Sequence, residues 1–254
     1  MVIEEPLLEA TFIRRYKRFL MDVRLANGRV LTVHCPNSGS MEGCLAEGAP
    51  VICSKAANEK RKLAYTAECI RLPSGWVGIN THRTNLLAGE ALRAGWIPEL
   101  ANYKEVKAEV PYGQASRIDF LLTSPDLPPC FVEVKNTTWP TPDGGVGFPD
   151  AITDRGLKHL KELRGVVRKG GRAIMLYVVN REDGAFFRPA LEKDRAYARG
   201  LAKALRAGVE IMARRVAFAL PELKLDGELR CFAHRGRTLI PAAAYGHNGK
   251  EGPV

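Results

Sequence analysis

The sequence predicts an α+β protein of two domains, a small closed β-barrel followed by an α/β domain built on a mixed sheet. Up to about residue 82, short β-type runs alternate with turn residues, whereas from residue 84 the apolar residues take up helical spacing. Ala173–Val179 is a continuous apolar run, typical of a strand buried on both faces. The 254 residues are 46% hydrophobic and 26% charged, which suits two globular cores and excludes a disordered chain.

Residues 1–82 are assigned to the barrel. The Asn27-Gly28 pair predicts a hairpin turn between two β-type runs. Five strands in so short a segment favour an oligonucleotide-binding (OB) fold, a common small barrel. The predicted strands are Ile13–Leu25, Arg29–His34, Pro50–Ser54, Lys62–Arg71 and Trp76–Asn80. Between them, the Cys35–Cys44 segment is rich in Asn, Ser and Gly. Its amides could bind an anion, or it could be a structural turn.

Residues 83–236 are assigned to the α/β domain. Leu157, Leu160, Leu163 and Val167 line one face of a predicted helix, at spacings of three and four. The alternation of helices and strands indicates a mixed sheet. The predicted helices are Asn85–Trp96, Asp154–Lys169 and Glu192–Ala207, and the predicted strands are Lys104–Tyr112, Ser116–Thr123, Cys130–Asn136, Ala173–Val179 and Val209–Phe218. We expect residues 237–254 to form a flexible tail.

The charge is unevenly distributed along the chain. Lys and Arg number 38 against 28 Asp and Glu, a net charge of +10 that favours a polyanionic partner. Residues 83–150 hold 6 basic and 9 acidic side chains, and residues 151–237 hold 20 and 10. A metal site beside a phosphate-binding surface would have this pattern, and so would a solvated helical face. Both interpretations remain open.

The sequence also predicts a cellular setting. No segment approaches the roughly 20 apolar residues that cross a bilayer, so no membrane partner is expected. Glu4 and Glu5 stand where an export signal would carry basic residues. The six cysteines are widely spaced and form no Cys-x-x-Cys. We therefore expect a cytoplasmic protein with reduced thiols.

Two carboxylates and a lysine fall on neighbouring predicted strands. Side chains alternate across a strand, so Asp119 points away from Ile118, while Glu133 and Lys135 share a face. The hairpin-like loop between the strands predicts that Asp119 and Glu133 lie side by side. Such a pair of oxygen ligands suits Mg²⁺ or Mn²⁺, with Lys135 orienting a water or stabilising charge on a phosphate. The alternative is a salt bridge of Lys135 on a solvated sheet face.

Glu90 adds a third candidate carboxylate. It falls within the predicted buried stripe formed by Leu87, Ala91 and Ala94. A lone carboxylate there is costly unless it is paired or bound to a metal. The alternative is an edge position from which the side chain reaches solvent.

Basic residues gather around these candidates and in the barrel. In the barrel they surround Tyr16 and Phe19, a mixture suited to stacking bases and neutralising phosphates, or to a strand with one side in water. On the Asp154–Lys169 helix they form the polar side, where His159 could serve a phosphate site or simply lie on the surface. The predicted nucleic-acid-binding residues are Arg14, Arg15, Lys17, Arg18, Arg117, Arg155, Lys158 and His159.

Eight short segments between residues 15 and 160 carry a family resemblance. They are Arg15–Phe19, His34–Met41, Asn58–Lys62, Val77–Thr81, Tyr112–Phe120, Val132–Asn136, Phe148–Ala151 and Arg155–Leu160. These segments resemble the bacterial and archaeal sugar fermentation stimulation protein A family, and the Asp…Glu-x-Lys order resembles the PD-(D/E)xK nucleases. The resemblance implies an N-terminal OB barrel and a C-terminal restriction-endonuclease-like domain. It also implies DNA binding and a link to regulation of sugar-utilisation genes.

The resemblance assigns roles position by position. The first acid of the nuclease motif falls on Asp119, the second on Glu133 and the lysine on Lys135. Glu90 matches the acid that many such nucleases place on the helix before the sheet. Ile118 stands where the motif has proline, a departure shared by many relatives of these nucleases.

Two hypotheses follow. The first is a metal-dependent nuclease or phosphodiesterase in which Asp119, Glu133 and the carbonyl of Val134 bind Mg²⁺ or Mn²⁺. The second is a non-catalytic DNA-binding regulator that uses the nuclease-like domain as a platform. RNA or nucleotide processing is a third, since nothing in the sequence separates DNA from RNA. The oligomeric state is left open, a homodimer included.

Overall fold

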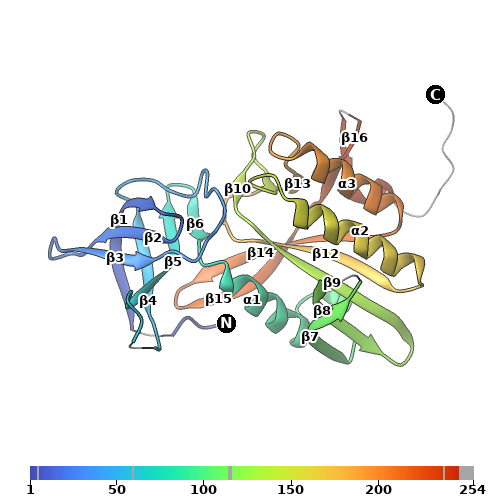
Figure 1. Ribbon diagram of the computed structural model, residues 1–254, viewed down its shortest axis with the longest axis horizontal. Coiled ribbons are helices and arrows are strands. Elements are labelled where there is room, and N and C mark those ends of the chain that lie inside the picture. Colours follow the sequence, from blue (N-terminus) through green and yellow to red (C-terminus); the bar gives the residue numbers. More distant parts are fainter. Residues whose placement is uncertain (5, 59, 114–115, 237, 246–254) are drawn as a thin grey trace.

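The computed structural model describes residues 1–4, 6–58, 60–113, 116–236 and 238–245. Figure 1 shows a β-barrel at one end of the molecule and a larger sheet-and-helix domain at the other. The predicted fold class, a small barrel followed by a mixed-sheet domain, is confirmed. Among the helices of the described ranges, none has the length and apolar character needed to cross a membrane.

Six strands form the barrel in the order β3-β2-β1-β4-β5-β6, and a pairing of β3 with β5 closes it. The hairpin predicted at Asn27-Gly28 joins β2 and β3. The barrel core includes three buried free thiols, those of Cys35, Cys44 and Cys53. The strands are β1 (Leu7–Tyr16), β2 (Leu20–Arg24), β3 (Val30–His34), β4 (Pro50–Lys55), β5 (Tyr65–Leu72) and β6 (Gly75–Gly78).

The prediction of a single extended run over Ile13–Leu25 is wrong. The chain reverses between Tyr16 and Leu20, and β1 and β2 pair as an antiparallel hairpin. Lys17 and Arg18 turn the chain with φ of 46° and 64°, in the left-handed region that non-glycine residues seldom adopt. The turn contains no Gly, Asn or Pro, so the usual sequence signals of a reversal are missing.

A six-stranded mixed sheet in the order β15-β14-β12-β9-β8-β7 forms the second domain. β14, β12 and β9 are parallel, while β9, β8 and β7 are antiparallel. The strands are β7 (Glu105–Tyr112), β8 (Ser116–Ser124), β9 (Leu127–Thr137), β12 (Arg172–Val179), β14 (Glu210–Ala219) and β15 (Glu222–Leu229).

Helices cover both faces of this sheet. α1 (His82–Arg93) lies on one face, and α2 (Asp154–Arg168) and α3 (Arg195–Arg206) lie side by side on the other (Figure 1). β12 is central, and its alternate side chains enter the two cores, which explains its unbroken apolar sequence. α3 starts three residues later than predicted because Asp194 caps it, accepting the N–H of Tyr197 at 2.9 Å.

Several short elements had no sequence signal. They are η1 (Pro98–Leu100), β10 (Trp139–Pro140), β11 (Val146–Phe148), β13 (Phe187–Pro189), β16 (Phe232–Arg235), β17 (Thr238–Pro241) and η2 (Ala242–Tyr245). The last two correct the expected start of the flexible tail at residue 237. β17 pairs with β16, and η2 buries Ala242 and Tyr245 against the core beneath α3. Residues 246–254 of the expected tail lie outside the described residues.

Candidate functional site

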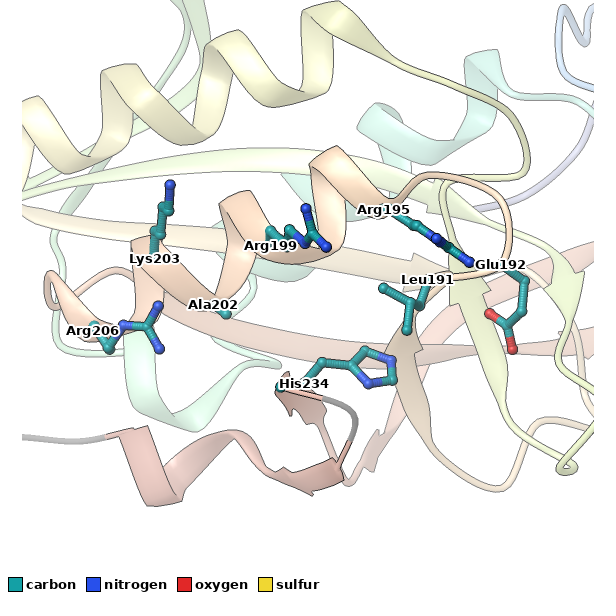
Figure 2. A pocket seen from close by; sticks show the side chains of 9 residues that line it. Leu191, Glu192, Arg195, Arg199, Ala202, Lys203, Arg206 and His234 are labelled. Atoms are coloured by element: carbon teal, nitrogen blue, oxygen red, sulfur yellow. The ribbon is translucent and has the colours of Figure 1, made fainter. Parts of the chain in front are cut away.

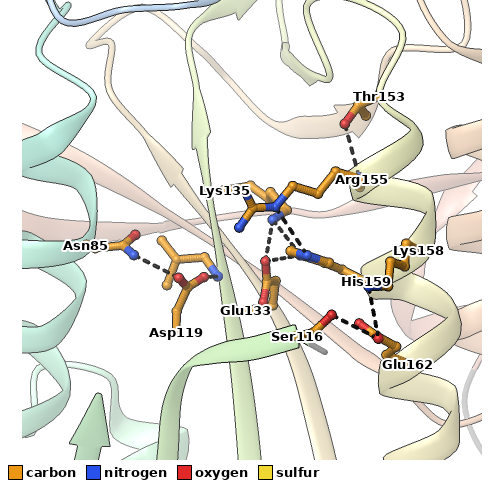
Figure 3. A network of polar contacts seen from close by, with 12 residues as sticks. Asn85, Ser116, Asp119, Glu133, Lys135, Thr153, Arg155, Lys158, His159 and Glu162 are labelled. Carbon is orange, nitrogen blue, oxygen red and sulfur yellow. Dashed lines mark hydrogen bonds and ion pairs between the residues drawn. The ribbon is translucent and has the colours of Figure 1, made fainter. Parts of the chain in front are cut away.

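The candidate site lies where β8 and β9 separate. The two strands pair antiparallel as far as Phe120 and Val132. Beyond that point the N–H of Val134 donates to Oδ2 of Asp119 at 2.7 Å, and Asn85 of α1 donates to Oδ1 at 2.8 Å (Figure 3). N–H and C=O of one strand residue point to the same side, so the Val134 carbonyl faces the same gap. The predicted juxtaposition of the two strands is therefore found.

Glu133 lies at the centre of a polar cluster between the sheet and α2 (Figure 3). It is only 2% exposed. Its Oε1 accepts a hydrogen bond from Nζ of Lys135 at 2.5 Å and contacts Nδ1 of His159. His159, itself buried, also lies 3.3 Å from Nζ of Lys135. Lys135 and His159 thus both contact the same oxygen of Glu133, Oε1.

The second oxygen of Glu133 is left unsatisfied. Oε2 is buried and has no hydrogen-bond partner among the described residues. An unpaired carboxylate oxygen in a buried position is costly, so this atom is suited to bind a cation. No three His, Cys, Asp or Glu side chains of the described ranges converge on one point. A cation here would need the Val134 carbonyl and water to complete its coordination.

The two carboxylates respond differently to their surroundings. Burial, and then the charge of Glu133, raise the pKa of Asp119 above its ordinary value. Burial acts in the same direction on Glu133, but His159 and Lys135 outweigh it and lower the pKa of Glu133. The charge of Lys135 and the hydrogen bonds from Val134 and Asn85 therefore compensate Asp119 only in part, in a site that already holds a second carboxylate. A divalent cation would supply the remaining positive charge.

Glu90 does not belong to this cluster, which corrects its predicted role. Its side chain is 42% exposed and pairs with the amino group of Met1 at 2.8 Å. Ala94, counted in the buried stripe, is exposed at the end of α1. The residue of α1 that reaches the site is Asn85, five positions earlier and about 140° away around the helix.

Asn85 reaches Asp119 because α1 packs closely on β8. Gly89, one turn after Asn85 on the same face, lies against the ring of Phe120, where a Cβ would come within 3.0 Å. The sequence carries no direct signal for Asn85, since a polar residue near the start of a helix can cap the helix, face solvent or contact a neighbouring element. Glu162 and Ser116, which bond at 2.9 Å beside the cluster, were also missed as site residues. Glu162 could have been found, because it lies three residues after His159 on the predicted polar side.

The remaining basic candidates of the second domain surround the cluster. Arg155 is exposed, with Nε 3.5 Å from Nε2 of His159. Lys158 is half-exposed and lies 3.7 Å from Glu162. Arg117 is exposed on β8 and donates to the carbonyl of Glu109 at 3.1 Å. All three side chains lie at the surface, where a phosphate could contact them, whereas His159 is buried within the cluster and is placed to act on Glu133 and Lys135 instead.

The basic residues of the barrel divide into two kinds. Arg14 pairs with Asp22 at 2.9 Å, and Arg15 donates to the carbonyls of Asn37 and Gly39. Lys17 and Arg18 are exposed at the tip of the β1–β2 hairpin, next to the exposed ring of Phe19. This tip keeps the mixture of basic and aromatic side chains that nucleic-acid binding would use.

The Cys35–Cys44 segment forms a structural turn that contacts the second domain. The N–H of Ser40 donates to Oδ2 of Asp150 at 2.7 Å, and the N–H of Gly39 donates to the side chain of Asn37 at 2.9 Å. Because these amides are already bonded within the protein, the anion-binding alternative loses two of its donors.

Comparisons with known proteins agree with this architecture. A family model described as "SfsA N-terminal OB domain" matches residues 13–79, and one described as "Sugar fermentation stimulation protein RE domain" matches residues 82–222. The sugar fermentation stimulation protein homolog of Acidithiobacillus ferrooxidans is 50% identical over 221 residues, covering 87% of this chain and 95% of that protein. The homolog of Geobacter sulfurreducens is 47% identical over 234 residues, covering 92% and 99%.

A solved structure is also similar. It is described as the structure of Pyrococcus furiosus SfsA in complex with Ca²⁺, and it shares 28% sequence identity and a TM-score of 0.79. The match covers 91% of this chain and 99% of that chain. Both domain models match in order, and relatives near 50% identity align over almost their whole length. The chain therefore belongs to the SfsA family of sugar fermentation stimulation proteins.

Proposed function

We propose that this protein binds nucleic acid, with DNA as the first expectation, and cleaves its phosphodiesters with the aid of a divalent cation. Asp119, Glu133 and the Val134 carbonyl would hold Mg²⁺ or Mn²⁺. The observation that carries the proposal is the buried, unpartnered Oε2 of Glu133, which lies beside an Asp119 whose pKa is raised by burial and by the charge of Glu133. Oxygen donors of these types are the ligands that such ions prefer.

The description of the Pyrococcus relative supports the metal part of the proposal, because that protein is named as a complex with Ca²⁺. The nucleic-acid part is supported by the net charge of +10 and by the exposed Arg117, Arg155 and Lys158 around the cluster. Carboxylates beside a polyanion oppose binding unless a cation neutralises them. Metal binding and nucleic-acid binding therefore depend on each other in this proposal.

The chain's own residues define the chemistry. A divalent cation bound here supplies Lewis-acid polarisation of a phosphoryl oxygen and lowers the pKa of water. Lys135 would orient the attacking water or stabilise the charge that develops on the phosphate, from a position fixed by Glu133. His159 is a positioning residue, because it contacts Glu133 and lies within 3.3 Å of Nζ of Lys135.

The second candidate is a DNA-binding regulator without turnover. It is favoured by the contacts of Lys135 and His159 with Oε1 of Glu133, which neutralise that carboxylate without a metal. A nuclease-like domain with such an internal ion pair can serve as a binding platform. RNA or nucleotide phosphodiesters are the alternative substrates, since no contact among the described residues of the site distinguishes one sugar from another.

The test compares cleavage and metal binding in matched variants. Supercoiled plasmid, linear duplex and single strands are incubated with Mg²⁺, Mn²⁺, Ca²⁺ or EDTA. We expect nicking that requires Mg²⁺ or Mn²⁺ and falls at least about 100-fold in Asp119→Asn, with DNA affinity in EDTA largely unchanged. Glu90→Gln is the control, since it removes a carboxylate of the same domain outside the cluster. Gel retardation without cleavage in any lane would contradict the nuclease proposal and support the DNA-binding regulator. If the protein neither retards nor cleaves DNA, the same assays are repeated with RNA.

A further inference from the structure

A row of cationic side chains follows one face of α3. Arg195, Arg199, Lys203 and Arg206 are spaced by four, four and three residues, which places them on the same side of the helix. At about 1.5 Å per residue the row extends about 16 Å. α3 contacts α2, β13 and β14, and the cavity that the row lines includes neither Asp119 nor Glu133, so the row is separate from the cluster described above.

Within the described residues, these cations have no paired counter-charge. None of the four forms an ion pair within the described part of the chain, and α3 contains no acidic residue. The nearby Glu192 is already bound by Arg188 at 2.6 Å. Like charges one turn apart destabilise a helix, and a solvated face usually mixes both signs, as Lys158 and Glu162 do on α2. The row therefore favours an anion from outside the chain.

The row lines a concavity rather than a convex face. Together with Leu191, Glu192 and His234 it borders a cavity of about 680 Å³, here named the α3 groove (Figure 2). Both ring nitrogens of His234 are buried and have no hydrogen-bond partner among the described residues. Burial, together with the charge of Arg188, lowers the pKa of His234, so the neutral ring offers one donor and one acceptor.

The basic surface continues toward α2. A second cavity, of about 330 Å³, shares Arg199 and Lys203 with the α3 groove and adds Lys161 and Arg164 of α2. Nε of Arg164 is another buried donor without a partner in the described structure. The cations are thus arranged along a line that an extended chain of phosphates would match better than one compact anion.

We propose that the α3 groove binds the phosphate backbone of a nucleic-acid strand. The identification of the ligand as a nucleic acid rests on the proposed nucleic-acid function, whereas the inference that the groove binds phosphate groups depends on the groove alone. Free polyphosphate offers the same chemistry and is separated from a nucleic acid by the experiment. The groove gives the protein a phosphate-binding surface in addition to the cluster at Glu133.

The experiment measures binding in EDTA, so that cleavage plays no part. Fluorescein-labelled 20-nucleotide single strands and 20-base-pair duplexes are titrated by anisotropy across a range of salt. The test variant is R195A/R199A/K203A. The variant R195K/R199K keeps the charges, and R93A/K104A/K107A removes three exposed charges elsewhere in the same domain. Thermal unfolding confirms that each variant is folded.

We expect R195A/R199A/K203A to weaken binding at least tenfold near 0.1 M salt. The slope of log affinity against log salt should become shallower by about 2 for single strands and about 3 for duplexes, because about three phosphate contacts are lost. The charge-keeping variant should stay within about threefold of the parent, as should the control triple variant. Equal affinity and slope in the parent and R195A/R199A/K203A would overturn the proposal.

A titration with tripolyphosphate distinguishes a nucleic-acid ligand from free polyphosphate. Tripolyphosphate is titrated into the parent and the test variant by calorimetry. If the parent binds it but no nucleic acid, the nucleic-acid occupant is overturned, and so is the nucleic-acid part of the proposed function. If nucleic acid binds equally to both proteins while cleavage still depends on Asp119, the groove proposal fails and the proposed function stands.

Discussion

Asp119 takes the place of a backbone acceptor on β8, because its Oδ2 receives the N–H of Val134 at 2.7 Å. The regular ladder between β8 and β9 reaches Phe120 and Val132, and the carboxylate then enters the gap. This contact anchors Asp119 beside Glu133 and turns the Val134 carbonyl to the same side. Asp119 is thereby held next to the backbone of the residue that follows Glu133.

Asn85 is expected to tune this site through Asp119. Its Nδ2 donates to Oδ1 of Asp119 at 2.8 Å, so Asn85→Ala should free the carboxylate to rotate. Losing such a partner of a metal ligand typically weakens metal affinity by about 10- to 100-fold. Calorimetric titration with Mn²⁺ measures the effect. Asn102→Ala, at an exposed position outside the cluster, is the control, and equal affinities for all three proteins would contradict the assigned contact.

Asp22 makes the stability of the barrel depend on pH. It accepts hydrogen bonds from Thr32 at 2.7 Å, Arg14 at 2.9 Å and Tyr16 at 3.1 Å. Burial acts in the opposite direction, but these partners lower the pKa of Asp22 below its ordinary 3.8. With the folded pKa below the unfolded one, the ionised carboxylate stabilises the fold above the ordinary pKa. That stabilisation is lost as the pH falls through the folded value.

Asp22→Asn should therefore reduce the free energy of unfolding at pH 7 by roughly 1 to 3 kcal/mol. The difference from the parent should begin to shrink below about pH 4, where the Asp22 carboxylate of the unfolded parent takes up its proton, and it should vanish once the folded protein is protonated as well. Urea unfolding at pH 7 and pH 3 measures both values. Asp226→Asn, at an exposed position of β15, should have little effect at either pH. A deficit in Asp22→Asn that is the same at both pH values would refute the assigned linkage.

Gly147 is required by the packing of a tryptophan. It lies opposite Trp139 in the β10–β11 pair, and a Cβ there would come within 2.6 Å of the buried indole ring. A ring held in a core cannot move aside cheaply, so Gly147→Ala should destabilise the protein by about 1 to 3 kcal/mol.

The matched control for Gly147 is Gly165 within α2. A Cβ at Gly165 meets nothing closer than 3.9 Å. Gly165→Ala should therefore stabilise the protein by about 0.5 to 1 kcal/mol, because alanine loses less backbone entropy in a helix. Chemical unfolding of both variants measures the two changes, and a shift of the same sign in each would contradict the packing argument.

Much of the second domain follows from local pattern. Alternation of side chains along β9 places Glu133 and Lys135 on one face, and the hairpin loop makes β8 and β9 antiparallel neighbours. The apolar run Ala173–Val179 is β12, buried on both faces. These features depend on periods of two residues and on short loops, which neighbouring residues decide.

The helix contributions to the site depend instead on how elements pack. Periodicity gives the buried face of α1 but not its rotation against β8, and the contact of Gly89 with Phe120 turns Asn85, not Glu90, toward Asp119. The polar side of α2 was expected, yet its burial against the sheet is what brings His159 onto Glu133.

By itself the sequence determined the order of a barrel and a mixed sheet and the family resemblance, and it proposed Asp119, Glu133 and Lys135 as candidate site residues. Only the tertiary structure decided the turn at Lys17 and Arg18, the hairpin of β16 and β17, and the partners of each carboxylate. The physical reason is the separation in sequence of the residues that determine each feature. Strand alternation and helix periodicity are set by residues a few positions apart, whereas the burial of Glu133 and its free oxygen arise from elements far apart in the chain.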